Sequence, residues 1–105
     1  MSYGGGLNQT ARDVLTVSTT AVSLTLPAAP HGNPKHVLIY VANAPIRWRA
    51  DGTAPTSTTG MYVAANTYLE FIEPLWDYRS IITRIQFIRD TTAGADSTLE
   101  IAFFN

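Results

Sequence analysis

The chain has 105 residues and a formal net charge of −1, and only 14% of its residues are charged while 46% are hydrophobic. This length fits one domain with a single core, and the near-neutral charge without a basic cluster predicts neither a nucleic-acid partner nor an anionic membrane surface. The absence of cysteine excludes disulfides, thiolate metal sites and cysteine nucleophiles, and it suits folding in a reducing cytoplasm.

Low charge combined with many Thr, Ala and Tyr residues is unusual for the surface of a free monomer. It predicts that partner subunits cover part of this surface, in a homo-oligomer that is a trimer or a dimer. The alternative is that Thr and Asn replace charged residues as solvating groups. No apolar stretch approaches the length of a membrane span, and the N-terminus lacks the features of a secretory signal.

The first eleven residues are predicted to form a flexible N-terminal arm (1–11), followed by one β-sandwich domain (12–105). Three consecutive glycines, residues 4–6, make this arm costly to order. It is either a frayed terminus or a segment that becomes ordered against a neighbouring subunit, with Tyr3 and Leu7 as its anchors.

Beyond the arm, apolar side chains recur at every second position, which is the period of a strand with one buried face. The pattern predicts short strands over 14–18 and 22–26, the second ended by Pro27. Residues 36–42 are apolar on both sides and predict a central strand that is buried on both faces.

A turn at 43–45 leads to a strand over 46–49 in which Ile46 and Trp48 face inward and the two arginines face outward. Residues 51–60 are small and polar and predict an exposed loop.

Two further strands, 61–63 and 68–71, flank a hairpin turn where Asn66 is the residue that best tolerates a positive φ. Residues 73–80 break the alternation and predict a crossover between sheets. A strand over 81–89, a turn over 91–96 and a closing strand over 97–104 complete the chain.

These segments amount to seven or eight short strands with no amphipathic helix. Strands at this spacing predict an all-β fold, an antiparallel β-sandwich or barrel of jelly-roll or Greek-key type.

Ionisable residues form no grouping typical of a metal or catalytic site. His31 and His36 flank a Gly/Pro loop and are expected to be solvated, and Asp90 and Asp96 are expected to cap a turn rather than bind calcium. No catalytic, cofactor or metal site is therefore predicted, and the protein is expected not to be an enzyme.

Glycoside chemistry by paired carboxylates is the remaining enzymatic hypothesis, with Glu70, Glu73 and Asp77 as candidates. Residues three apart on a strand point to opposite faces, and Pro74 interrupts the segment. These carboxylates are therefore not expected to act together.

Arginine and aromatic residues supply the best candidates for contacts with partners. The outward guanidinium groups of Arg47 and Arg49 suit carboxylate pairing across an interface, or else they belong to an ordinary solvated strand face. Trp76 and Tyr78 either pack a corner of the core or form a contact patch. The full set of predicted partner contacts combines the arm, these patches and the exposed loop: Tyr3, Leu7, Arg47, Arg49, Thr56, Thr58, Trp76 and Tyr78.

The loop "ADGTAPTSTTG" followed by "MYVAANTYLEF" resembles a pattern found in small structural proteins of tailed bacteriophages. The leading "TVSTTAVSLT" and the closing "STLEIAFF" are similar in order, whereas the segment "EPLWDYRS" departs from the pattern. The resemblance implies a non-enzymatic virion component, most plausibly a capsid decoration (cement) protein, with a tail or neck accessory protein as the alternative. Its partners would be the major capsid protein or other virion proteins, and it would be assembled in the host cytoplasm.

A module that binds carbohydrate or a host receptor is the second functional hypothesis. In that case Trp48, Trp76 and Tyr78 would be exposed platforms on which a ligand stacks.

Overall fold

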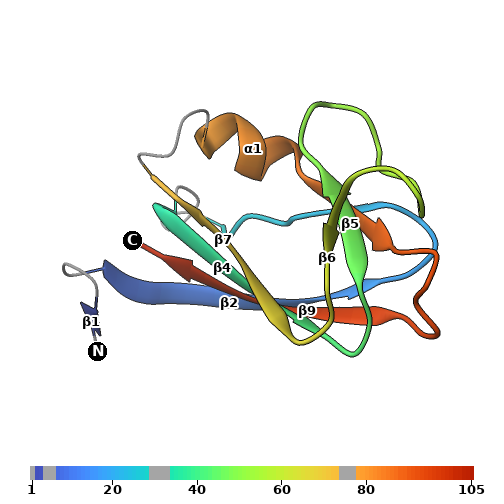
Figure 1. Cartoon of the computed structure of the whole chain (residues 1–105). Helices are drawn as coiled ribbons and strands as arrows, with labels where there is room; N and C mark the ends of the chain where they lie inside the picture. Colours follow the sequence, from blue (N-terminus) through green and yellow to red (C-terminus); the bar gives the residue numbers. More distant parts are fainter. Residues whose placement is uncertain (1, 4–6, 29–33, 74–77) are drawn as a thin grey trace.

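Two antiparallel sheets pack face to face in the computed structural model, which describes residues 2–3, 7–28, 34–73 and 78–105 (Figure 1). The larger sheet contains, in spatial order, β1 (Ser2–Tyr3), β2 (Leu7–Val17), β9 (Ser97–Phe104), β4 (His36–Ala42) and β7 (Thr67–Ile72). The smaller sheet contains β3 (Val22–Ser23), β8 (Gln86–Arg89), β5 (Ile46–Arg49) and β6 (Met61–Val63). One helix, α1 (Tyr78–Arg84), precedes β8.

The strand order is that of a jelly roll. If the eight strands from β2 to β9 are counted along the chain, the larger sheet has the order first, eighth, third, sixth, which is β2-β9-β4-β7. The smaller sheet has the order second, seventh, fourth, fifth, which is β3-β8-β5-β6. Two interlocked Greek keys produce this arrangement. The predicted all-β sandwich is therefore confirmed, and the topology selects the jelly roll from the predicted alternatives.

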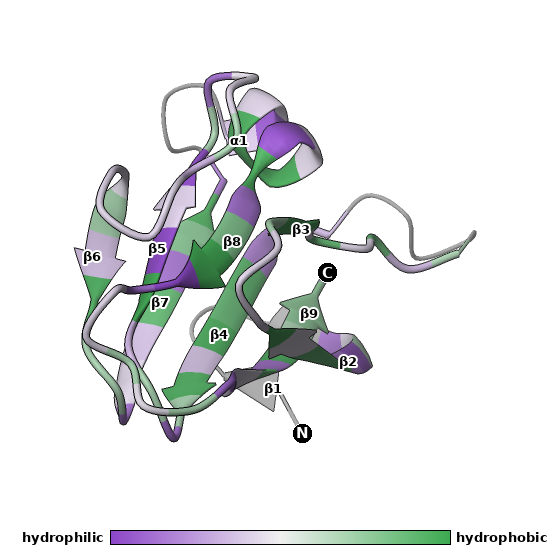
Figure 2. Cartoon of the chain, turned by 90° about the vertical axis from the view of Figure 1, so that its right-hand side faces the viewer, coloured by the Kyte–Doolittle hydropathy of each residue, from purple (hydrophilic) through white to green (hydrophobic). Residues whose placement is uncertain are grey.

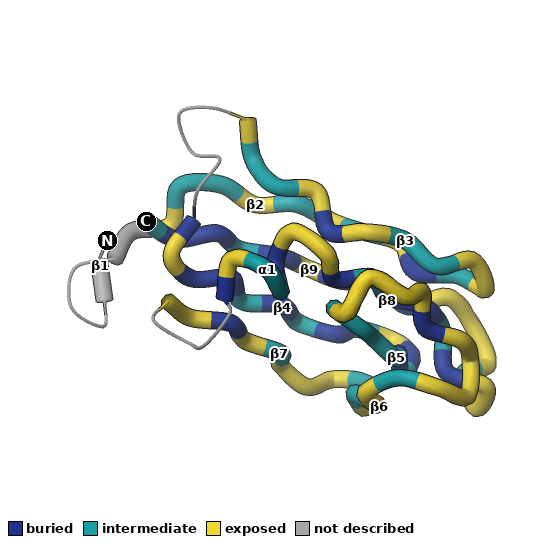
Figure 3. The backbone as a smooth tube through the Cα atoms, turned by 90° about the horizontal axis from the view of Figure 1, so that it is seen from above, coloured by how far each residue is buried: buried dark blue, intermediate teal, exposed yellow. Residues whose placement is uncertain are grey.

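The core lies between the two sheets, where residues of alternating position on each strand meet (Figure 3). On β4 the inward side chains Val37, Ile39 and Val41 are fully buried. Figure 2 shows the corresponding hydrophobic bands along β4 and β8. The outward residues Leu38 and Tyr40 are only half-buried, so the prediction that this strand is buried on both faces is wrong. Its outer side forms part of an open sheet face.

Residues 78–84 form a helix where the sequence pattern predicts a crossover and the start of a strand over 81–89. Ile85 N–H donates to the Ile81 carbonyl at 2.9 Å, and Tyr78 and Ile82, four residues apart, are both buried. The apolar spacing fits a helical face as well as a strand, and α1 fills the space above the larger sheet beside the shorter one (Figure 1). The expected absence of any helix is therefore wrong.

The first long strand begins earlier than predicted. Residues 7–11, assigned to the arm, belong to β2, where Gln9 and Ala11 pair with Phe104 and Phe103 across a register shift. β1 in turn pairs with the start of β2. The second predicted strand is shorter, because only Val22–Ser23 join the sheet. None of the helices in the described part of the chain is long and apolar enough to cross a membrane.

Candidate functional site

No described helix or strand covers the outer face of the larger sheet, and its register arranges side chains in rows across the strands. One row contains Val14, Glu100, Tyr40 and Tyr68, which are direct neighbours on β2, β9, β4 and β7. The next row contains Arg12, Ala102, Leu38 and Glu70. Because Ala102 is small, a hollow of about 270 Å³ opens above it.

An aromatic pair forms one wall of this hollow. The rings of Tyr40 and Tyr68 lie 5.0 Å apart at 53°, and Tyr68 is 66% exposed. The Tyr40 hydroxyl donates to Asn66 Oδ1 at 3.2 Å. On the opposite side, Arg12 Nη2 contacts Glu100 Oε1 at 3.4 Å, and both side chains are mostly exposed. Aromatic rings beside hydrogen-bonding groups around a hollow are typical of small-ligand sites.

At one end of this face, His36 is buried rather than solvated, which corrects the prediction for this residue. Its ring stacks on Phe104 at 4.9 Å, and its Nε2 lies 2.7 Å from Glu70 Oε2. The strand places the imidazole between β7 and β9, where these neighbours cover it. Glu70, a candidate for acid/base chemistry from the sequence, therefore forms a cross-strand pair with His36.

One margin of the sandwich carries most of its exposed large hydrophobic side chains. Four of the five such residues in the described part of the chain lie on β6 and β7, namely Met61, Tyr62, Tyr68 and Ile72. These two strands are the outermost strands of their sheets, and they run along the same side of the molecule (Figure 3). We call the exposed side of β6 and β7 the β6–β7 margin. The fifth exposed residue, Val14, lies on β2.

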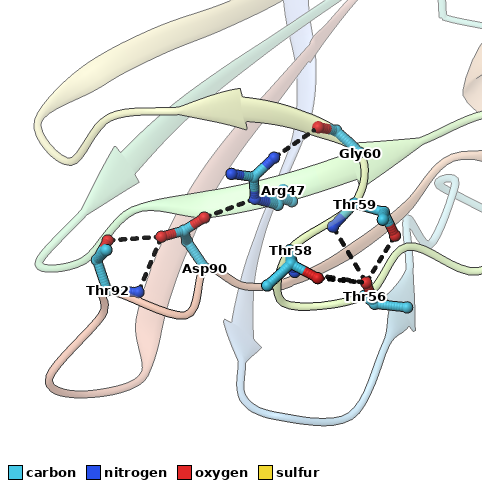
Figure 4. Close-up of polar contacts among 7 residues, drawn as sticks. All are labelled: Arg47, Thr56, Thr58, Thr59, Gly60, Asp90 and Thr92. Carbon is cyan, nitrogen blue, oxygen red and sulfur yellow. Dashed lines mark hydrogen bonds and ion pairs between the residues drawn. The ribbon is translucent and has the colours of Figure 1, made fainter.

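Arg47, the first arginine predicted to contact a partner, instead bonds to residues of its own chain (Figure 4). Its Nε donates to Asp90 Oδ1 at 2.6 Å and its Nη1 to the Gly60 carbonyl at 3.0 Å, while the guanidinium lies 5.7 Å from the Tyr62 ring. Asp90 also accepts from the Thr92 backbone N–H at 2.9 Å, so the prediction that it caps a turn is confirmed. This site is a structural clamp between β5 and the turn after β8.

The hydrogen bonds around Asp90 favour its charged form. The Thr92 hydroxyl and N–H are the main donors, and together with Arg47 they hold the pKa of the Asp90 carboxyl below its usual value, although burial opposes this. The second arginine, Arg49, pairs with Asp51, whose pKa is lowered to about 2 by that side-chain hydrogen bond and by the Thr53 N–H. Both predicted arginine contacts thus have internal carboxylate partners.

The loop over 51–60 is exposed as predicted, but it has internal order. Pro55 is buried beneath it, and Thr56 and Thr59 form an isolated bridge in which each backbone N–H donates to the other's carbonyl. The Thr56 hydroxyl also lies 2.6 Å from the Thr59 hydroxyl and accepts from the Thr59 N–H at 3.0 Å (Figure 4). Thr56 and Thr58 are exposed on this ordered tip.

The tip also contacts the turn that follows β8. Thr91 N–H donates to the Ser57 carbonyl at 2.9 Å, and the two segments border a hollow of about 460 Å³. The loop is therefore held against the same turn that carries Asp90.

Two of the aromatic residues that were candidates for contacts, Tyr78 and Trp48, pack inside the chain. Tyr78 is buried, and its hydroxyl donates to the Pro34 carbonyl at 2.7 Å, so the predicted contact patch at this residue is wrong. Burial, reinforced by Glu73, raises the pKa of the Tyr78 hydroxyl to about 12. Trp48 packs edge-on against Phe71 with ring centroids 5.4 Å apart, which confirms its inward orientation. It is therefore a poor stacking platform.

Three predicted positions have no described side chain. Trp76 lies outside the described residues, while Tyr3 and Leu7 are placed by their backbone in β1 and β2. Sequence reasoning did not identify the β6–β7 margin as a site. The signal available for it was the pair of apolar residues Tyr68 and Ile72, two strand periods apart on the polar side of β7.

Comparison of the chain with protein-family models, with curated proteins and with solved structures found no match.

Proposed function

We propose that this protein is a non-enzymatic structural component of a virus particle, most concretely a capsid decoration protein that binds as a homo-oligomer to the major capsid protein. The observation that carries the proposal is the β6–β7 margin, where exposed hydrophobic side chains gather on two outermost strands. Exposed large hydrophobic side chains that gather in one region mark sites of protein association, and this margin carries four of the five in the described part of the chain. The resemblance of residues 37–71 to small phage structural proteins supplies the choice of partner.

The rest of the architecture supports an assembly role. Jelly rolls occur in viral capsid and lectin domains, although a fold by itself does not assign a function. The Arg47–Asp90 ion pair, with the hydrogen bond from Arg47 to the Gly60 carbonyl, ties the loop end of the sandwich together within the chain. A rigid body with an apolar margin would join neighbouring shell subunits by burying that margin at their junction, stabilising the assembled shell through binding.

Particle association is the direct test. Particles purified from a culture that carries this gene should contain the protein in stoichiometric amounts after gradient centrifugation, and adding purified protein to particles that lack it should raise the melting temperature of the shell. Its absence from purified particles, or its failure to sediment with them, would contradict the proposal.

A matched pair of variants connects this test to the margin. Ile72→Lys places a charge within the β6–β7 margin, whereas Val14→Lys places one at an apolar residue of comparable exposure on β2. Particle occupancy should fall for Ile72→Lys and be preserved for Val14→Lys. Equal occupancy of the two variants would remove the margin from the proposal.

Carbohydrate or receptor binding is the second candidate, favoured by the hollow beside Tyr40 and Tyr68. A sugar ring would stack on exposed Tyr68 while its hydroxyls meet the Arg12 and Glu100 side chains, which offer both donors and acceptors. Titration with a panel of oligosaccharides, followed by NMR, should then shift resonances around this hollow. Tyr68→Ala should abolish the shifts and Tyr62→Ala should not, and a spectrum unchanged by millimolar sugar would exclude this candidate.

A further inference from the structure

The backbone of β7 has a free edge, and the hydrogen-bond pattern shows which residues face it. Glu73 N–H donates to the Lys35 carbonyl at 2.8 Å, one step beyond the end of the β4–β7 ladder and in its register. Hydrogen-bonded and non-hydrogen-bonded pairs alternate along an antiparallel ladder. Odd-numbered residues of β7 therefore bond to β4, and the even-numbered residues direct their backbone N–H and C=O groups away from it: Tyr68, Glu70 and Ile72.

This edge has few of the features by which sheet proteins usually prevent pairing with another chain, and its only charged residue is Glu70. β7 contains no Lys or Pro, and its register with β4 has no bulge. Among the described strands it is the outermost of its sheet, and the residues with outward backbone groups also have exposed side chains. An added strand could therefore form backbone hydrogen bonds here and cover apolar surface at the same time.

We propose that two copies of this chain pair through β7, antiparallel and about a two-fold axis, so that their five-stranded sheets join into one continuous sheet. The inference rests on the homo-oligomer of the proposed function and names its interface. Leu69 lies on the axis, opposite Leu69 of the second copy, and Tyr68 lies opposite Glu70 of the second copy. Each Tyr68–Glu70 pair exchanges both backbone hydrogen bonds, because both residues have outward backbone groups.

Self-complementarity selects a second copy as the occupant and Leu69 as the centre. In this register each Tyr68 hydroxyl, a donor, faces a Glu70 carboxylate, an acceptor, and the axis brings two leucine side chains together. Moving the axis by one residue to Glu70 would place Glu70 opposite Glu70, where like charges repel, and moving it by one residue to Tyr68 would lose both Tyr68–Glu70 pairs. Met61 and Tyr62, also exposed, lie on β6, the outermost strand of the smaller sheet, and are outside this β7 contact.

Single-cysteine cross-linking tests the interface and the register, since the natural chain has no cysteine. Residues at the centre of a non-hydrogen-bonded antiparallel pair have Cα atoms about 4.5 Å apart, which a disulfide can bridge. Leu69→Cys should therefore form a reducible dimer under mild oxidation, roughly tenfold faster or more than Glu70→Cys or Val14→Cys. A Leu69→Cys variant that stays monomeric, or cross-linking at equal rates for all three, would overturn the proposal.

A second experiment uses the backbone without introducing cysteine, in case Leu69→Cys disturbs the fold. Tyr68→Pro removes an outward N–H that β4 does not use, and Tyr68→Ala removes the same ring but keeps that N–H. In sedimentation equilibrium, Tyr68→Pro should weaken dimerisation about tenfold more than Tyr68→Ala, with both variants folded by circular dichroism. Equal dissociation constants for the two variants would contradict pairing through this edge.

The two proposals fail separately. A chain that attaches to particles while remaining monomeric at high concentration would overturn β7 pairing and leave the virion function standing. A dimer that cross-links at Leu69 but is absent from purified particles would support the interface and remove the function.

Discussion

Two arginines on β5 occupy equivalent positions on the strand but very different environments. Arg47 and Arg49 are two residues apart and so point to the same face of the smaller sheet. Arg47 binds Asp90, whose side chain is 2% exposed, whereas Arg49 binds Asp51, which is 56% exposed. From this difference we expect the burial of the carboxylate, more than the arginine or its spacing, to decide how much each ion pair contributes to stability.

The Asp90 site also connects more of the chain. Arg47, Gly60 and Thr92 all bond around it, so one cluster ties together β5, the loop before β6 and the turn after β8 (Figure 4). Within the described part of the chain, Asp51 bonds to residues two positions away in sequence, Arg49 at the end of β5 and the Thr53 N–H. Four experiments would break or sharpen this contrast, in order of decreasing expected effect.

Asp90→Ala should have the largest effect. Removing the carboxylate leaves the partly buried Arg47 guanidinium without its charge partner, which should lower the free energy of unfolding by about 3 kcal/mol. Urea unfolding monitored by circular dichroism measures this. Asp96→Ala is the matched control, since Asp96 also pairs with an arginine but is half-exposed, and it should cost less than about 1 kcal/mol. Similar losses for both variants would refute the importance of burial here.

Arg47→Lys should come second. A lysine keeps the charge but cannot reach Asp90 and the Gly60 carbonyl together with a planar fork, so the free energy of unfolding should fall by about 1.5 kcal/mol. Arg49→Lys, measured in the same urea series, should fall by clearly less. A larger loss of unfolding free energy for Arg49→Lys than for Arg47→Lys would contradict the stronger role of the Asp90 site.

The third-largest effect should be on the loss of stability in acid, to which Asp90 contributes. Because the folded-state pKa of Asp90 lies below its usual value, its contribution is present above about pH 4 and is lost as the pH falls through the folded pKa. Asp90→Asn should therefore flatten the acid limb of the stability–pH curve, measured by thermal melts. An unchanged limb in Asp90→Asn would mean that another carboxyl group dominates acid unfolding.

Asp51→Ala should have the smallest effect. Although the pKa of Asp51 is lowered to about 2, the group is exposed and solvent screens its pairing with Arg49. The global unfolding midpoint should not change measurably, while the Thr53 amide, which donates to Asp51 at 3.2 Å, should exchange with solvent faster. A clear drop in the midpoint would contradict the assignment of this pair as a local feature.

Local patterns predicted several elements correctly. The closing strand over 97–104, the inward orientation of Ile46 and Trp48, and the positive φ of Asn66, observed at 62°, all follow from period-two alternation or turn chemistry. The helix over 78–84 was missed because Tyr78, Ile81, Ile82 and Ile85 satisfy a helical and an extended pattern alike. Only the shorter second sheet, which leaves space for a helix, resolves this ambiguity.

Candidate contacts were harder to predict than strands. Arg47 and Tyr78 are residue types that are common at interfaces. In the fold, however, Arg47 bonds to Asp90 and Tyr78 bonds to the Pro34 carbonyl, both distant in sequence. His36 was expected in solvent and is covered by Phe104 and Glu70. In each case burial depends on residues that are brought close only by the fold.

By itself, the sequence determined that this chain folds as an antiparallel all-β domain, a sandwich or a barrel, since alternation with period two is a local property that each strand carries independently. The tertiary structure alone decided the jelly-roll order, the partners of the charged residues and which strands lie at the open margins. These features depend on pairing between segments far apart in the chain, and no local pattern specifies which strand will be left with a free edge.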